Sequence, residues 1–545
     1  SGINLNIASQ REPLFQQLAR LANKQWQAAS LLAEPSIEPF TVQPVLSPQD
    51  NRQVVGQVVM ASPTQATQAV TYAQAAFVAW RDKPVSERAQ MLERLAGLLD
   101  EHQAELISLC TREAGKLLQD GIDEVREAVD FCRYYANLAR SVMAPTLLPG
   151  YTGEHNTLLA QGRGVFVCIS PWNFPLAIFI GQVSAALVTG NTVIAKPAAQ
   201  TCLIAHLATQ LAHLAGIPQA VLQLVIGDGA SIGQALIADS RISGVCFTGS
   251  TATAQHINRT LADRPLAKKN SAIIPFIAET GGQNAMIVDS SAQPEQVVRD
   301  VIRAAFQSAG QRCSALRVLY LQSDIYDRVL TLLSGAMAEL SVGDPAFWST
   351  DVGPVIDKSA HAKLTEHIQQ MQAAGKTLIA QTPLGTDFEH GHYISPTLIA
   401  IEAISELSQE HFGPILHVVR FNADQIEQVI DDINHTGYGL TLGIHSRNER
   451  FAQHIASRAN VGNIYINRDQ IGAMVGVQPF GGQGLSGTGP KAGGPHYLTR
   501  FITEKTISHN TAAIGGNASL LSQEERLEEG KRTNINNGAH ENERG

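Results

Sequence analysis

The chain contains 545 residues, of which 44% are hydrophobic and 16% charged, and its formal net charge is −9. This composition supports a large core in two or three domains of ordinary size and excludes global disorder. The acidic balance, without any basic cluster, argues against a nucleic-acid partner. Because no apolar run reaches about 18 residues and no signal peptide is recognisable, we expect a cytoplasmic protein without a membrane segment.

The six cysteines form no Cys-x-x-Cys pair, and most of them lie in apolar segments. We therefore expect a reducing environment, no disulfide framework and no metal site. The chain begins with Ser1-Gly2 in place of Met, which we interpret as a tag remnant, a processed terminus or a piece cut from a longer polypeptide.

The first quarter of the chain has mainly helical patterns. Residues 9–34 predict a short amphipathic helix, within an N-terminal helical arm that we assign to 1–40. A Pro-rich extended stretch follows over 34–50, and residues 64–144 again have the apolar spacing of helices.

Between residues 164 and 282, short apolar runs alternate with helix-length segments. Strands that are apolar on both faces indicate a buried parallel sheet covered by helices. We therefore predict a doubly wound α/β domain of the nucleotide-binding type. The predicted strands are 164–170, 192–195, 221–226, 244–248 and 275–278.

A second α/β pattern extends from about residue 284 to residue 472. Its predicted strands are 285–288, 317–321, 417–421 and 461–466, and its predicted helices are 294–309, 324–339 and 359–374. A Gly-rich loop follows over 481–495. The tail, 518–545, carries many charges and few apolar residues, so we expect it to be disordered.

Three side chains supply the groups that covalent oxidation of an aldehyde requires. Cys313 lies among small residues that leave room around its sulfur, and its thiolate could attack the carbonyl. Asn173 and Glu279 each follow a predicted strand, where an amide could hold the oxyanion and a carboxylate could activate water. Taken singly, each residue has a plainer interpretation: an inert buried cysteine, a turn asparagine and a capping carboxylate.

Two further strand ends suggest nucleotide contacts. Lys196 ends one predicted strand, where its ammonium could reach a ribose hydroxyl or a phosphate. Phe247-Thr-Gly-Ser-Thr251 closes the predicted strand 244–248, so the helix that follows could present its N-terminus to a pyrophosphate. As a glycine-rich phosphate-binding motif this stretch is weak, because no GxGxxG motif lies near it.

Together these residues strongly resemble the aldehyde dehydrogenase superfamily, over about residues 40–517. The matching motifs are Pro171-Trp-Asn-Phe-Pro175, Lys196-Pro197, Phe247-Thr-Gly-Ser-Thr251, Glu279-Thr-Gly-Gly-Gln283, Gly310-Gln-Arg-Cys313, Glu410-His-Phe-Gly-Pro414 and Pro479-Phe-Gly-Gly482. Their number and their order along the chain make the resemblance highly specific.

The resemblance implies an aldehyde dehydrogenase fold of three parts. A Rossmann-like NAD-binding domain would comprise 41–144 and 166–282, and an α/β catalytic domain would comprise 283–495. A β-flap for oligomerisation would comprise 145–165 and 496–517, so we expect a homodimer formed through it.

The same resemblance implies roles for individual residues. Cys313 would be the nucleophile and Glu279 the general base, while Asn173 and the Cys313 N–H would form the oxyanion hole. Glu410 would bind the nicotinamide ribose, and Phe412 would lie beside the nicotinamide ring. The other implied cofactor contacts are Lys196, Ser250, Ser170, Trp172 and Gly249.

Longer stretches resemble one branch of this superfamily, the L-glutamate γ-semialdehyde (pyrroline-5-carboxylate) dehydrogenases. Residues 277–291, 308–317, 485–495 and 510–520 are most similar to the form within bacterial proline utilization A, where a proline dehydrogenase domain comes first. The implied reaction is the NAD-dependent oxidation of this aldehyde to L-glutamate in proline catabolism. A proline dehydrogenase domain would then be a partner in the full-length chain.

The substrate implied by this branch carries a carboxylate and an ammonium group at the end remote from the aldehyde. Backbone N–H groups of Gly493 and Gly494 could form a nest for the carboxylate, with the Ser314 hydroxyl as a further donor. The resemblance implies that Phe501 packs against the aliphatic part. A plain turn is the alternative interpretation of the two glycines.

One position departs from the family. Ala199 stands two residues after Pro197, where many NAD-preferring relatives carry a Glu that binds the adenosine ribose. The absence of this Glu removes charge-assisted hydrogen bonds of about 1.5–3 kcal/mol, and it also removes repulsion against a 2′-phosphate. We expect NAD as the cofactor, with NADP as an alternative.

The sequence is also compatible with two alternative functions. One is an aldehyde dehydrogenase for another substrate, such as succinate semialdehyde. The other is a non-catalytic structural module that kept the fold. A CoA-acylating enzyme fits less well, because Glu279 would then have no task.

Overall fold

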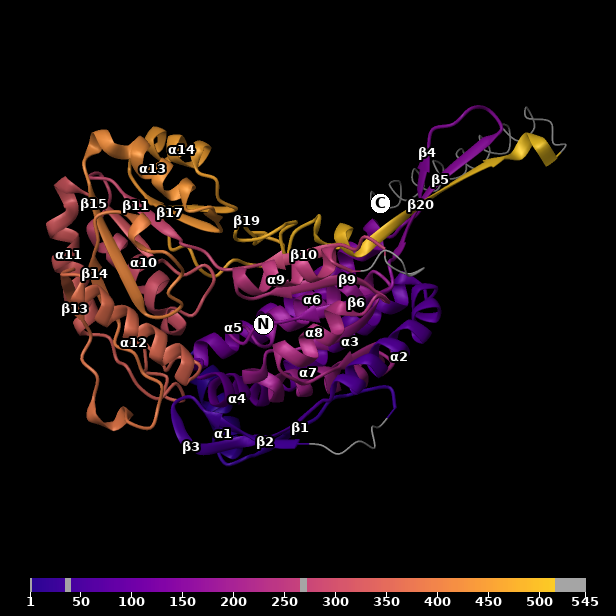
Figure 1. The fold of residues 1–545 in the computed structure, drawn as a ribbon, viewed down its shortest axis with the longest axis horizontal. Coiled ribbons are helices and arrows are strands. Elements are labelled where there is room, and N and C mark those ends of the chain that lie inside the picture. Colours follow the sequence, from indigo (N-terminus) through magenta and orange to yellow (C-terminus); the bar gives the residue numbers. More distant parts are fainter. Residues whose placement is uncertain (1, 35–40, 265–271, 515–545) are drawn as a thin grey trace, which may run out of the picture.

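The computed structural model describes residues 2–34, 41–264 and 272–514, and Figure 1 shows two α/β bodies with a ribbon that projects from one of them. Among these residues, no helix is both long enough and apolar enough to span a membrane. All six cysteines are free thiols.

The first body is built on a five-stranded parallel sheet in the order β10-β9-β6-β7-β8. The strands are β6 (Val165–Ile169), β7 (Thr192–Lys196), β8 (Leu222–Leu224), β9 (Ile242–Thr248) and β10 (Phe276–Glu279). All five predicted strands are confirmed. The order runs outward from β6 in both directions, so the carboxyl ends of β6 and β9 flank a switch point, where α/β sheets bind ligands.

Helices cover both faces of this sheet (Figure 1). The helices of this body are α2 (Pro63–Arg81), α3 (Val85–Glu101), α4 (Gln103–Ala114), α5 (Leu118–Val142), α6 (Ala177–Val188), α7 (Cys202–Leu214), α8 (Gln234–Ala238) and α9 (Thr251–Ala262). The long helix α5 packs against α3, α4 and α6. Phe131 and Tyr135 of α5 are buried in the same core as the sheet, so α5 reaches from this core toward the second body.

The second body is a seven-stranded sheet in the order β13-β14-β15-β12-β11-β17-β18, parallel except for β13. The strands are β11 (Ala285–Val288), β12 (Val318–Gln322), β13 (Leu378–Gln381), β14 (Thr397–Ala400), β15 (Ile415–Phe421), β17 (Thr441–His445) and β18 (Asn463–Ile466). The helices are α10 (Pro294–Phe306), α11 (Ser323–Ala338), α12 (Lys358–Ala373), α13 (Ile426–His435) and α14 (Glu449–Arg458). The four predicted strands are confirmed.

Two sequence predictions need correction. The helix predicted over 9–34 is wrong beyond Leu21: α1 covers Ala8–Leu21, and Trp26–Ala28 forms β1 with alternating burial. β1 pairs with β3 (Asp50–Met60), which also pairs with β2 (Thr41–Ser47), so backbone pairing overrides a weak helical pattern. The predicted helix 294–309 ends at Phe306, because Ser308 and Ala309 adopt left-handed backbone angles.

Short elements complete the chain. The small strands β16 (Tyr438–Gly439) and β19 (Gln483–Gly484) pair with each other. The short helices are η1 (Ala199–Thr201), η2 (Gly229–Gly233), η3 (Gln307–Gly310), η4 (Thr386–Phe388), η5 (Ile404–Glu406), η6 (Ala423–Gln425), η7 (Tyr497–Phe501) and η8 (Thr511–Ile514).

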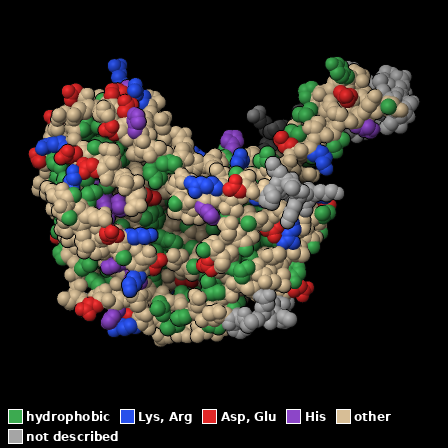
Figure 2. Space-filling model, in the orientation of Figure 1, with side chains coloured by type: hydrophobic (Ala, Val, Ile, Leu, Met, Phe, Trp, Pro, Cys, Tyr) green, Lys and Arg blue, Asp and Glu red, His purple; other side chains and the backbone are tan. Residues whose placement is uncertain are grey.

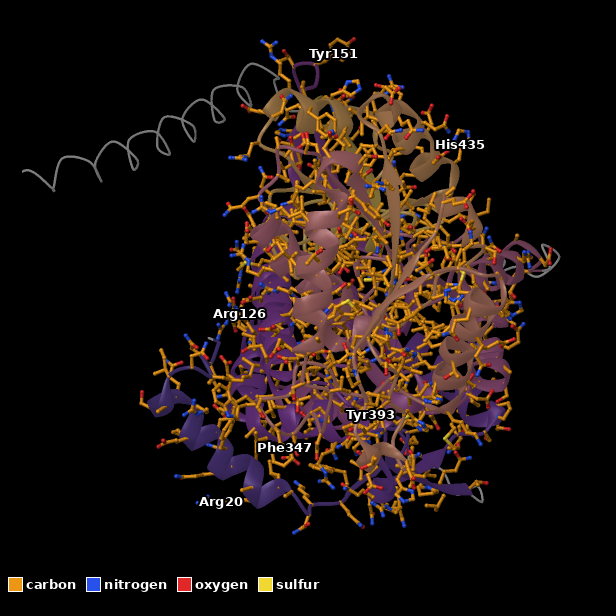
Figure 3. All side chains as sticks on the ribbon, turned by 90° about the vertical axis from the view of Figure 1, so that its left-hand side faces the viewer. Arg20, Arg126, Tyr151, Phe347, Tyr393 and His435 are labelled. Atoms are coloured by element: carbon orange, nitrogen blue, oxygen red, sulfur yellow. The ribbon has the colours of Figure 1, made fainter. Side chains whose placement is uncertain are left out.

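The projecting ribbon is a three-stranded antiparallel sheet in the order β20-β5-β4. It contains β4 (Thr146–Leu148), β5 (Glu154–Gly162) and β20 (Ile502–Asn510), which fall within the predicted flap ranges. Leu147 is 73% exposed and Tyr151 is 87% exposed. Figure 3 shows Tyr151 pointing outward at an extremity of the molecule. The tail expected to be disordered lies outside the described residues.

Close packing in the first sheet gives a stability prediction. A Cβ atom on Gly244 of β9 would overlap the ring of Phe166, whereas a Cβ on Gly335 of α11 would meet nothing within 4 Å. Gly244→Ala should therefore lower the free energy of unfolding by about 1–3 kcal/mol. Gly335→Ala should raise it by about 0.5–1 kcal/mol. Urea denaturation measures both, and a neutral Gly244→Ala would contradict the packing described.

Candidate active site

A cavity of about 710 Å³ lies between the two bodies, where Figure 2 shows the surface hollowed. Its wall includes Pro171–Phe174 after β6, Thr248–Ala252 after β9, Glu279–Gly281 after β10, Arg312–Ser314 after η3 and Gln409–Phe412 before β15. Carboxyl ends of parallel strands carry binding groups in α/β folds. The fold thus brings Cys313, Glu279 and Asn173 to one cavity.

Cys313 is only partly buried, whereas the other five cysteines are buried. Ser308, Ala309 and Gly310 all have positive φ angles (56°, 53° and 66°), and this turn leads the chain from α10 to the thiol. Burial, followed by the charges of Glu410 and Glu279, raises the pKa of the Cys313 thiol to about 12. Arg312 opposes these effects. The thiolate is therefore the minor form in the free protein at neutral pH.

Glu279 ends β10 and lies under the Gly-rich loop. Both of its carboxylate oxygens are buried, without a good hydrogen bond from the described part of the chain. A Cβ on Gly481 would lie 2.6 Å from Oε1, and a Cβ on Gly487 would lie 3.2 Å from Oε2. Burial raises the pKa of Glu279 well above its usual value, although the Gly482 N–H and Lys491 oppose this. A raised pKa makes its carboxylate a stronger base toward water.

Asn173 is held beside the segment that carries the thiol. Its Nδ2 donates to the carbonyl oxygen of Gln311 at 3.2 Å, and its own backbone carbonyl accepts from Lys116 Nζ at 2.6 Å. An amide nitrogen has two hydrogens, so the second can serve an oxyanion formed at Cys313.

Five of the predicted cofactor residues line the cavity: Trp172, Gly249, Ser250, Glu410 and Phe412. The Ser250 Oγ caps α9, accepting from the Thr253 N–H at 3.2 Å, and this helix N-terminus faces the cavity. Trp172 meets Phe412 edge to face at 5.6 Å between ring centroids.

Two predicted cofactor residues do not line the cavity. Lys196 is buried, and its Nζ donates to the Pro197 carbonyl at 3.2 Å. Burial lowers the pKa of Lys196. Ser170 is also buried, and its Oγ has no hydrogen-bond partner among the described residues. An unsatisfied buried hydroxyl is costly, so Ser170 fits a site that a polar ligand completes.

Glu410 is fixed by a second arginine, Arg317, whose Nη2 donates to Glu410 Oε1 at 3.1 Å. The other end of the Arg317 guanidinium donates to the Gly310 carbonyl at 2.7 Å. Burial raises the pKa of Glu410, while Arg317 opposes this. A Cβ on Gly281 would overlap the Glu410 carboxylate, which explains the glycine after Glu279-Thr280.

The substrate contacts predicted at Gly493, Gly494 and Phe501 need correction, because none of the three lines the cavity. The Gly493 N–H donates to Tyr135 Oη at 2.8 Å, so it is already used. A Cβ on Gly494 would lie 2.9 Å from Pro479, so this glycine serves close packing. Phe501 is fully buried against Phe166, at 5.0 Å between ring centroids. Only Ser314 of the predicted substrate residues lines the cavity.

The structure adds cavity residues that the sequence reasoning missed. Gly472 and Ala473 line the wall, and within the described ranges neither N–H donates a hydrogen bond. Phe480 lies on the same wall. Glu127 enters from α5, and burial together with Glu124 raises its pKa to about 8. Gly472-Ala473 carries no sequence signal, whereas Glu127 follows Asp120 and Glu124 on one helix face, a spacing that could have drawn attention.

The sequence pattern of the aldehyde dehydrogenase family matches residues 37–507. The chain belongs to this family. It is 46% identical to the bifunctional protein PutA of Escherichia coli K12, over 93% of this chain and 38% of that protein. The chain therefore spans less than two-fifths of the length of that relative. It is also 36% identical to 1-pyrroline-5-carboxylate dehydrogenase of a Geobacillus strain, WCH70, over 85% of this chain and 89% of that one.

Solved structures agree with this family assignment. Proline utilization A of Bradyrhizobium japonicum matches with a TM-score of 0.84 and 48% identity, over 94% of this chain and 48% of that one. A 1-pyrroline-5-carboxylate dehydrogenase from Thermus with bound NAD matches with a TM-score of 0.89 and 31% identity, over 94% and 98%. The predicted aldehyde dehydrogenase fold is thus confirmed.

The raised pKa of the Cys313 thiol leads to a pH-dependent prediction. Because thiolate is the reactive form, alkylation of the free protein by iodoacetamide should accelerate about tenfold per pH unit between pH 7 and 9, without a plateau. Labelling should be confined to Cys313, since the other cysteines are buried, and Cys313→Ala should abolish it. A plateau below pH 8 would show that the pKa of Cys313 is low in the free protein.

Proposed function

We propose that this protein oxidises L-glutamate γ-semialdehyde to L-glutamate with NAD as the cofactor. The observation that carries the proposal is the meeting of Cys313, Glu279 and Asn173 in one cavity with nucleotide-binding features along its wall. The names of the relatives, 1-pyrroline-5-carboxylate dehydrogenase and PutA, support the choice of substrate.

The proposed reaction uses groups of this chain in sequence. The Cys313 thiolate adds to the aldehyde carbon, and the oxyanion of the thiohemiacetal accepts from Asn173 Nδ2 and the Cys313 N–H. NAD, when bound, supplies the acceptor for the hydride that leaves this carbon. Glu279 then takes a proton from the water that attacks the thioester, which releases the carboxylic acid and the thiol.

The cavity wall fits the proposed cofactor. The N-terminus of α9 at Ser250 offers N–H groups to a pyrophosphate, and Phe412 and Trp172 offer apolar faces to the nicotinamide. Lys363 of α12 also lines the cavity and forms no ion pair within the described ranges, so it can neutralise a phosphate. Ala199 is exposed and carries no acceptor for a ribose, so NADP is the alternative cofactor to NAD.

Both charged groups of the proposed substrate would find partners in the cavity. The free N–H groups of Gly472 and Ala473, with the Ser314 hydroxyl, suit the carboxylate. Glu127 suits the ammonium group, because a buried carboxylate gains most from a cation that arrives with the ligand. Phe480 then contacts the aliphatic part. This set replaces the Gly493, Gly494 and Phe501 site.

The fold supports a proposed domain division and a proposed assembly. We assign 41–144 and 166–282 to cofactor binding, 283–495 to catalysis and the projecting sheet to dimerisation. The exposed Leu147 and Ile507 of this sheet would be covered by a second copy. PutA relatives are much longer than this chain, so a proline dehydrogenase domain is the proposed covalent partner.

A substrate comparison tests the proposal. NADH formation, with NADP in parallel, should show kcat/KM for glutamate semialdehyde above those for glutarate semialdehyde and propanal. Glutarate semialdehyde lacks only the ammonium group, so Glu127→Gln should lower kcat/KM for the amino aldehyde by about 10- to 150-fold. This range corresponds to one charged hydrogen bond of about 1.5–3 kcal/mol. For glutarate semialdehyde, the kcat/KM of Glu127→Gln should differ little from that of the unsubstituted protein.

The pH profile gives a second readout of the same contact. As pH rises through about 8, Glu127 loses its proton and becomes able to pair with the ammonium group, so KM for the amino aldehyde should fall. Glu127→Gln should lack this inflection, and comparing the two proteins on one substrate stock cancels the titration of the substrate. Equal kcat/KM for propanal and the amino aldehyde would refute the proposed substrate but leave the thiol chemistry.

A further inference from the structure

Helix α5 presents three acidic side chains, Asp120, Glu124 and Glu127, toward the cavity side of the first body. Their spacing of four and three residues places them on one helix face. Asp120 and Glu124 are each only 1% exposed, and neither lines the cavity. Buried charges of this kind are costly unless other groups satisfy them fully, so their partners indicate what they do.

The partners of Asp120 all belong to the segment that carries the nucleophile. Its Oδ1 accepts from Arg312 Nη2 at 2.8 Å and from Gln307 Nε2 at 3.0 Å. Its Oδ2 accepts from the Ser308 hydroxyl at 2.8 Å, and Arg312 Nε donates to that same hydroxyl oxygen at 3.2 Å. Ser308 is one of the residues in the left-handed turn. Asp120 therefore holds the turn and the residue that directly precedes Cys313.

The partners of Glu124 either belong to the segment that carries the amide or donate to it. Its Oε2 accepts from the backbone N–H groups of Leu176 at 3.2 Å and Ala177 at 2.8 Å, where α6 begins. Its Oε1 pairs with Lys116 Nζ at 2.9 Å, and Lys116 donates to the backbone carbonyl of Asn173 at 2.6 Å. Glu124 and Lys116 thus hold both ends of the Asn173 segment.

The two clusters meet at one aromatic ring. Lys116 Nζ lies 4.1 Å from the centroid of the Phe174 ring, and the Arg312 guanidinium lies 5.3 Å from it. Each cation is thus confined both by a carboxylate and by this ring. Burial acts to raise the pKa of Asp120, but Arg312 and Lys116 outweigh it and hold the pKa below its usual value. The Asp120 side chain is therefore ionised at neutral pH.

We propose that Asp120 and Glu124 of α5, with Arg312 and Lys116, are positioning residues that fix the Cys313 thiol against the Asn173 amide. The inference rests on the thiol chemistry proposed above, but not on the identity of the aldehyde. One rigid helix holds both segments, so the distance between nucleophile and oxyanion donor depends on this helix. Reaction rates are sensitive to such geometry, since a misplacement of about 1 Å can cost about 100-fold.

The least disruptive test is Ser308→Ala, which removes the hydroxyl between Asp120 and Arg312 and leaves both charges in place. Ser446→Ala is the matched control: this buried serine donates to Asp289 at 2.5 Å and lies away from the cavity. With propanal and NAD, Ser308→Ala should lower kcat at least about fivefold, with KM and the Kd of NAD within about twofold. Ser446→Ala should keep kcat, although its melting temperature should fall similarly.

The charged pair gives a second test that separates position from electrostatics. Arg312→Lys keeps a cation near Cys313 but loses the fork that spans Asp120 and Ser308. The rate of Cys313 alkylation at each pH should stay within about threefold of the unsubstituted protein, while kcat for propanal falls at least about tenfold. Arg312→Met should lower both rates.

Two outcomes would overturn the inference. One is a Ser308→Ala protein that keeps kcat within twofold or loses it only in step with Ser446→Ala. The other is an Arg312→Lys protein with full kcat. If glutamate semialdehyde proves a poor substrate while propanal turnover responds as described, the proposed function fails and the positioning role stands.

Discussion

The site depends on the burial of ionisable groups in a single cavity. Cys313, Glu279, Glu410 and Glu127 all have raised pKa values, and burial is the largest cause for each of them. Low local polarity disfavours every charged form, so burial shifts each of these groups toward its neutral form in the free protein. A ligand that brings positive charge reverses this preference, which couples ionisation of the site to its occupation.

Cationic side chains of the protein itself pair with buried carboxylates around the cavity. Arg317 pairs with Glu410, and Arg312 and Lys116 serve Asp120 and Glu124. Each guanidinium or ammonium also donates to backbone carbonyls or to a hydroxyl of a segment that carries a reacting group. The cost of burying these charges is therefore offset by a defined position for the segments around the cavity.

The sequence predicted most of the sheet structure, because strands buried on both faces leave uninterrupted apolar runs. It missed β13, β14 and β17 of the second sheet. In β17, Thr441 and His445 are polar but buried, and Thr441 Oγ1 donates to the carbonyl of Ser314. It extended the first helix too far, since the alternation at Trp26–Ala28 becomes visible only when β3 is known as the partner.

The sequence predicted the site residues that lie within distinctive motifs. It did not predict single residues that the fold brings to the cavity from separate segments. The thiol, carboxylate and amide were found because each lies in a distinctive stretch. The glycines Gly493 and Gly494 looked like an anion nest, yet they serve packing and a bond to Tyr135. Gly472-Ala473 has an ordinary sequence, and only the folded chain shows that these two residues line the cavity.

The most direct test of the account is to look for the acyl group on the thiol. Glu279→Gln should still form the thioester but should hydrolyse it slowly, because no base activates water. Mass spectrometry of this variant, quenched in acid after reaction with glutamate semialdehyde and NAD, should find the glutamyl adduct on the peptide that contains Cys313, with about one NADH per site. An unmodified Cys313 with undiminished NADH turnover would contradict the account.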